Sequence, residues 1–170
     1  IREHQKDIFP RSATFLHTVE KIPETMPRRI RNRQDFKHLI DGYDGGINYM
    51  DKHIGEILQT LRELGVEDEV CIIISADHGE SMGEQGIYME HASATEAVHH
   101  LPLIMKIPGV TKSGTVIDGF VYHVDVVATI VELLGLDVPV GWDGKSFLPA
   151  LRGEEWKGRN YLIMDHGLFT

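Results

Sequence analysis

Asp77 and His78 are the adjacent side chains of this sequence that are best suited to chemistry. They come after the run Val70 to Ile74, with Ser75-Ala76 between, and such an apolar run is typical of a strand buried on both faces of a parallel sheet. In open α/β sheets, ligands bind just beyond the carboxyl ends of such strands. A carboxylate beside an imidazole can recruit a metal ion or an oxyanion, whereas a buried charged pair without such compensation would be costly. We therefore expect a binding site at this pair.

The elements that must hold this pair can be predicted from the spacing of the apolar residues. From about residue 35 to residue 64 they recur every three or four positions, which predicts a helix that Gly65 would cap. The glycines within it indicate close packing against a sheet, or a break near Gly45-Gly46. Further along we expect a strand over 69–75, a polar loop over 76–93, a short helical stretch near 94–99 and a strand over 101–107.

The rest of the chain predicts shorter elements. We expect a turn at Pro108-Gly109, a short strand over 115–118, a helix over 125–134 closed by Gly135, a turn over 147–151 and a final strand over 161–164. Helices that alternate with apolar strands predict an α/β fold, with a mainly parallel sheet sandwiched by helices. Because only two or three strands are convincing, we expect an incomplete domain.

Composition excludes several classes of protein. The chain has 17 Lys and Arg against 26 Asp and Glu, a net charge of −9, which argues against general binding to nucleic acid. No apolar run approaches the roughly 20 residues of a membrane span. The single cysteine, Cys71, excludes an intramolecular disulfide and a multi-cysteine metal site, and we expect it in the core. No signal peptide is recognisable, and because the sequence starts with Ile1 we expect part of the natural N-terminus to be missing.

An ordered set of motifs resembles the catalytic domain of the sulfatase family, within the alkaline-phosphatase superfamily. It begins with GYDGGINYMDKHIGEILQTLRELGVEDEVCIIISADHGESMGEQG and continues through TEAVHHLPLIMKIPGV, VDVVATIVELLGLDVP and DGKSFLPALRG. The resemblance covers about Gly42 to Gly153 and implies that residues 35–160 are the C-terminal part of such a domain. Residues 1–34 would be an irregular N-terminal segment, and residues 161–170 would begin a small C-terminal subdomain.

The resemblance implies a hydrolase of sulfate esters or sulfamates whose substrate is a sulfated small molecule or glycan. In this family a formylglycine, made from Cys or Ser in a C/S-x-P-x-R motif, attacks sulfur, and a divalent cation, usually calcium, holds the sulfate. Asp77 and His78 correspond to the late cation ligands of the family. The early Asp pair and the nucleophile motif have no counterpart here, and Cys71 is not in such a motif. We expect the formylglycine to lie in the missing N-terminal part of the polypeptide, and this chain to be inactive alone.

His91 stands where the family commonly has a lysine that contacts sulfate, counted back from Pro102. A protonated imidazole there could stabilise charge on the sulfate or protonate the leaving group. The departure from lysine favours N-sulfo or glycan substrates. His78 suits zinc, iron or nickel better than calcium, and could instead hydrogen-bond the nucleophile or the sulfate oxygens. The expected roles are therefore metal binding for Asp77 and His78, catalysis for His78 and His91, and substrate binding for His91.

Two other functions stay open. A phosphonate or phosphodiester hydrolase of the same superfamily would use manganese or zinc, and a non-catalytic module would bind a partner or an acidic glycan. Export from the cytosol is implied by the family resemblance alone. Several further residues receive structural interpretations: Glu80 and Glu84 order the loop, His99 and His100 pack or face solvent, and Asp125 caps a helix, although His123 with Asp125 could also resemble a two-zinc site. Asp165-His166 could reach the substrate.

Overall fold

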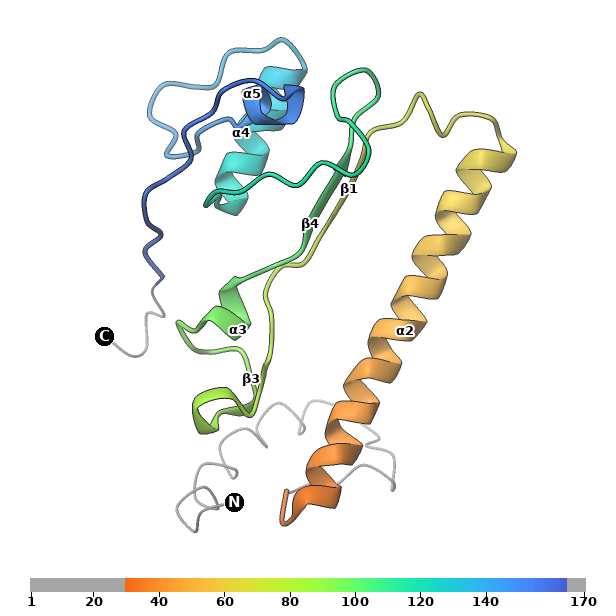
Figure 1. Cartoon of the computed structure of the whole chain (residues 1–170), viewed down its shortest axis with the longest axis vertical. Coiled ribbons are helices and arrows are strands. Elements are labelled where there is room, and N and C mark those ends of the chain that lie inside the picture. The colour runs from red at the N-terminus through yellow and green to blue at the C-terminus, as the bar shows by residue number, and fades with distance from the viewer. Residues whose placement is uncertain (1–29, 165–170) are drawn as a thin grey trace. The chain divides into compact units, whose positions relative to one another are not determined.

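The computed structural model describes residues 30–164 (Figure 1). These residues form two compact units, one made of residues 30–67 with Ala76–Leu101 and the other of Asp68–Ser75 with Pro102–Met164. Most of the predicted N-terminal segment and the Asp165-His166 pair lie outside the described residues. Within 30–164, no helix is both long enough and apolar enough to cross a membrane.

The first unit begins with helix α2, Arg33–Glu63, and both of its ends are capped. At the N-terminus, Oδ1 of Asn32 accepts hydrogen bonds from the backbone N–H groups of Gln34 and Asp35, at 2.8 and 2.9 Å. At the C-terminus, the chain turns at Gly65 with φ of +69°. The N–H of Gly65 donates to Arg62 and that of Val66 to Leu61, as in a Schellman motif. The predicted helix and its glycine cap are confirmed.

Three glycines of α2 neither break the helix nor approach another described segment. The helix runs without a break through Gly45-Gly46. A Cβ atom built on Gly45, Gly46 or Gly55 would meet nothing within 4 Å, so no neighbouring described segment requires these glycines. The expectation of a break is therefore wrong, and among residues 30–164 no close approach is found at these three glycines.

A β-hairpin and a one-turn helix complete the first unit. Strand β2, Ser81–Met82, pairs antiparallel with β3, Tyr88–Glu90, across the short turn η2, Glu84–Gly86. The turn needs the left-handed region, since Gln85 and Gly86 have φ of 56° and 80°. Helix α3, Glu96–His99, follows and agrees with the predicted helical stretch near 94–99. The Phe36 ring meets Tyr88 edge-on with centroids 5.5 Å apart, which packs the start of α2 on the hairpin.

The second unit contains strands β1, Ile72–Ser75, and β4, Leu103–Lys106. Their positions agree with the predicted strands, but they pair antiparallel, with Ile72 opposite Lys106 and Ser75 opposite Leu103. Both sheets of the described residues are antiparallel pairs, so the expected parallel pairing is not found in them. In β1, half-buried and exposed residues alternate, and Cys71 just before it is exposed. The expectations of a strand buried on both faces and of a core cysteine are therefore corrected.

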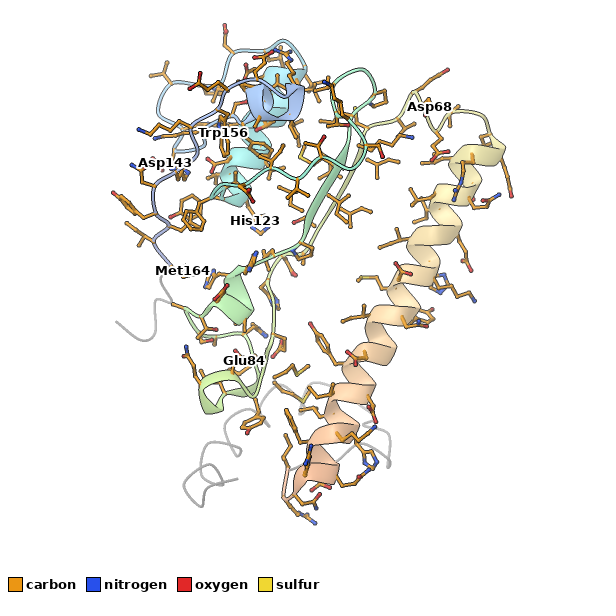
Figure 2. The ribbon with its side chains drawn as sticks, in the orientation of Figure 1. Asp68, Glu84, His123, Asp143, Trp156 and Met164 are labelled. Atoms are coloured by element: carbon orange, nitrogen blue, oxygen red, sulfur yellow. The ribbon has the colours of Figure 1, made fainter. Side chains whose placement is uncertain are left out.

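Two helices and a small apolar core close the second unit. Helix α4, His123–Leu133, packs with α5, Leu148–Arg152, and Gly135 caps α4 as predicted. The core contains Ile107, Phe147, Leu148 and Leu151, with the Trp156 ring against it (Figure 2). The strands predicted over 115–118 and 161–164 do not form, and an isolated bridge joins Phe120 to Arg159 instead.

Candidate functional site

Gly79 fixes the loop that follows β1. Its N–H donates to the carbonyl of Val98 at 2.7 Å, which presses the loop onto the backbone of α3. A Cβ atom at this position would overlap the carbonyl oxygen of Ala97, so only glycine allows the approach. The residues on either side of Gly79 are thereby held at one place on the first unit.

Asp77 and His78 lie together at the start of this loop. The N–H of His78 donates to Oδ1 of Asp77 at 2.9 Å. Nδ1 of His78 lies 2.9 Å from the carbonyl oxygen of Gly79, and because a carbonyl can only accept, this nitrogen must carry the proton. Nε2 is then an acceptor, and it lies 3.8 Å from Oδ2 of Asp77. Two acceptors that face each other in this way fit a shared cation.

The Asp77 carboxylate is kept ionised. The hydrogen bond from the His78 N–H lowers the pKa of Asp77, and a proton on the His78 or His91 ring would lower it further. The side chain is 89% exposed, so it is open to a ligand from solvent. An exposed, ionised carboxylate is what a hard divalent cation prefers.

The hairpin brings His91 onto this pair from 13 positions further along the chain. Ser81 and Glu90 are partners in the β2–β3 register, so Glu80 and His91 are the residues just outside that pair. Nδ1 of His91 lies 3.2 Å from Oε2 of Glu80. The His91 ring stacks on that of His78, with centroids 4.2 Å apart and an interplanar angle of 23°. All three predicted site residues, Asp77, His78 and His91, thus lie in one cluster.

Glu80 is the member of the cluster that sequence reasoning missed. It was expected to order the loop, as Glu84 does by accepting the N–H of Met82 at 2.6 Å. Glu80 instead contacts His91, and its side chain is only 18% exposed. The glycines at 83 and 86 indicate a turn, but the register that sets Glu80 beside His91 includes an irregularity between Ser81 and Met82 that the sequence does not indicate.

Asp125 has the structural role expected of it. It accepts the N–H of Tyr122 at 2.7 Å, which caps α4, and that of Lys145 at 2.6 Å. Nε of Arg159 donates to it at 2.8 Å, and the same guanidinium donates to the carbonyl of Asp143 at 2.9 Å. With both oxygens engaged and only 1% of the residue exposed, Asp125 cannot also serve the alternative two-zinc site with His123. His99 and His100 are exposed, which agrees with the expected surface positions.

Replacing Gly79 with alanine is expected to lower the free energy of unfolding of the chain by about 1–3 kcal/mol, because the new methyl group must displace the α3 backbone. Gly55→Ala is the matched control. It adds the same methyl group where nothing lies within 4 Å in a helix, and should stabilise by up to about 1 kcal/mol. Urea unfolding of both variants checks this. Equal effects of the two substitutions would contradict the close approach at Gly79.

The chain matches known proteins over most of its length. The family model described as Sulfatase matches residues 5–136. The chain is 29% identical over 151 residues to the multifunctional alkaline phosphatase superfamily protein PehA of Trinickia caryophylli, which covers 86% of this chain and 28% of that protein. It is 26% identical over 128 residues to the Delta 4,5-hexuronate-2-O-sulfatase of Bacteroides thetaiotaomicron, over 74% of this chain and 27% of that protein. The chain thus spans little more than a quarter of the length of these relatives.

A solved structure has the same fold. The phosphonate monoester hydrolase SpPMH from Silicibacter pomeroyi superposes with a TM-score of 0.73 at 28% identity, over 92% of this chain and 32% of that one. The predicted α/β class of the alkaline-phosphatase type is confirmed by this likeness, although the strand pairs described above are antiparallel.

Proposed function

Because the chain belongs to the sulfatase family, we propose that it contributes part of a hydrolase site that cleaves sulfate esters or sulfamates. Asp77 and His78 would be ligands of a divalent cation, and His91 would contact the sulfate group. The observation that carries the proposal is the stacking of His91 on His78, with centroids 4.2 Å apart beside the exposed Asp77 carboxylate. These are the positions that the family resemblance assigns to the site.

The residues at this position fit a divalent cation. The ionised Asp77 carboxylate suits a hard ion such as calcium, and Nε2 of His78 faces it as a second acceptor. When bound, the cation would neutralise negative charge on the sulfate. The imidazole of His78 would suit manganese or zinc as well. The formylglycine nucleophile would lie outside these 170 residues, in the remainder of the hydrolase domain.

His91 would bind and polarise the substrate. Its Nδ1–H donates to Glu80, which holds the ring in one orientation. The ring could then hydrogen-bond a sulfate oxygen, or protonate the leaving-group oxygen when it carries a second proton. A sulfated glycan is the substrate class that we favour, since one relative is named as a hexuronate 2-O-sulfatase.

A second candidate function is hydrolysis of a phosphonate monoester or phosphodiester. It is favoured by the likeness to a phosphonate monoester hydrolase, which extends over 92% of this chain. A non-catalytic module that binds an acidic glycan is the remaining alternative.

The test uses a polypeptide that joins this chain to the remainder of its hydrolase domain, matured by a formylglycine-generating system. We expect kcat/KM for an aryl sulfate to exceed that for an aryl phosphodiester and a phosphonate monoester by at least about tenfold, or about 1.4 kcal/mol in the barrier. EDTA should abolish the hydrolysis. Preference for the phosphorus substrates would favour the second function, and cleavage of none of the three would favour the binding module.

A further inference from the structure

His78, Glu80 and His91 each offer a donor atom, and the three atoms all lie within 4.8 Å of one another. No other such group of three is found among residues 30–164. We propose that these residues bind a borderline transition-metal ion of the zinc class, with two imidazole nitrogens and one carboxylate oxygen as ligands. This donor set is typical of zinc and differs from the oxygen-rich set that calcium requires. The proposal goes beyond the proposed hydrolase function and does not depend on it.

The two rings present different nitrogen atoms to the ion. A histidine that binds a metal almost always donates its other ring N–H to a backbone carbonyl or a carboxylate. Nδ1 of His78 donates to the carbonyl of Gly79, which leaves Nε2 as its ligand atom. Nδ1 of His91 lies 3.2 Å from Oε2 of Glu80, so these two atoms can bind one ion in place of the proton that they share. The carbonyl of Gly79 also fixes the orientation of the His78 ring before an ion arrives.

The backbone already places the three residues. The contact of Gly79 with Val98 holds the loop of His78, and the hairpin register sets Glu80 beside His91. Zinc bonds of 2.0–2.1 Å in a tetrahedral site separate the ligand atoms by about 3.4 Å. Atoms that start within 4.8 Å need side-chain movements on the order of 1 Å to reach that geometry. The backbone does not have to change.

The charge of the site favours a cation. Glu80 is 18% exposed in its side chain, so its charge is less screened by water than that of a surface carboxylate. Asp77 adds a second negative charge next to His78. Because the ion would engage both His78 and His91, it would compete with a hard cation for His78 and with sulfate for His91.

The test is a titration of the chain with Co²⁺ as the spectroscopic probe, followed by displacement with Zn²⁺. We expect one equivalent with the intense visible absorption of tetrahedral cobalt. Glu80→Gln and His91→Ala should each weaken binding at least tenfold. His100→Ala is the matched control. His100 also lies beside a carboxylate, that of Glu96 at 3.4 Å, but among residues 30–164 this pair is not part of a group of three possible metal ligands. It should leave the affinity unchanged.

Asp77→Asn separates this site from the proposed hydrolytic one. It should weaken calcium binding but change the cobalt affinity by less than threefold. Circular dichroism of each variant shows whether the chain is still folded. An octahedral cobalt spectrum, retention of tight binding in both Glu80→Gln and His91→Ala, or an equal loss in His100→Ala would overturn the proposal. The cobalt titration contains no substrate, so its outcome does not depend on whether the matured hydrolase cleaves a sulfate ester.

Discussion

Asp77→Ala is expected to lower kcat/KM for an aryl sulfate by about 10²–10³-fold in the matured hydrolase that contains this chain. The carboxylate is ionised, because the hydrogen bond from the backbone N–H of His78 lowers its pKa. It is also 89% exposed, so its removal leaves no buried group without a partner. The loss should therefore be one of cation and substrate binding rather than of stability. Added calcium should restore part of the activity if the cation is bound more weakly.

Asp68→Ala is the matched control for that substitution. Asp68 is an equally exposed carboxylate, at 96%, and it also contacts one basic side chain, Lys106, at 3.2 Å. An exposed ion pair of this kind contributes little to stability, and Asp68 is not among the proposed site residues. The activity of Asp68→Ala should therefore stay within about twofold of the parent. If Asp77→Ala retains full activity, or if both variants lose activity equally, Asp77 is not a ligand.

Asp125→Ala is expected to lower the free energy of unfolding by about 3–5 kcal/mol at pH 7. The substitution leaves the Arg159 guanidinium, which is 19% exposed, without its carboxylate partner. It also removes the acceptor for the N–H groups of Tyr122 and Lys145. Asp137→Ala, at an exposed position of the same unit, should change stability by less than about 0.5 kcal/mol. Urea unfolding of the three proteins measures the difference.

The effect of Asp125 should depend on pH. Burial opposes ionisation of this carboxyl, but the hydrogen bonds from Arg159 and from two backbone N–H groups outweigh it, so its pKa is lowered. A lowered pKa in the folded chain gives stability that is complete above the unfolded value of about 3.9 and is lost as the pH falls through the folded value. The difference in the free energy of unfolding between the parent and Asp125→Ala should therefore become smaller as the pH falls from 5 to 2. A gap that is independent of pH would contradict the ionic role.

The helices were predictable because several local features agreed. In α2 the apolar spacing ends at Leu64-Gly65, and in α4 it ends at Leu134-Gly135; in both cases the glycine adopts a positive φ. The hairpin at 81–90 was missed because its strands are two and three residues long and show no alternation of apolar and polar residues. Its turn depends on Gln85 in the left-handed region, which the residue type does not indicate.

The direction of strand pairing could not be predicted from the apolar runs. Such a run indicates burial, whereas direction depends on the connection between the strands. A parallel crossover usually contains a helix long enough to return along the strand. Between β1 and β4 the helix α3 has only four residues, and the strands pair antiparallel. In the site, Asp77 and His78 could be predicted from the strand end and His91 from the family resemblance. Glu80 could be found only once the hairpin register was known.

The carboxylate of Asp125 connects three stretches of the second unit that are far apart in sequence. It holds the start of α4 through Tyr122, the approach to α5 through Lys145, and the segment near the end of the described chain through Arg159. None of the three stretches can move away from the others without breaking a hydrogen bond to the Asp125 carboxylate. The backbone amides of Tyr122 and Lys145 should therefore exchange with solvent in a single opening event, so that these stretches unfold as one cooperative block.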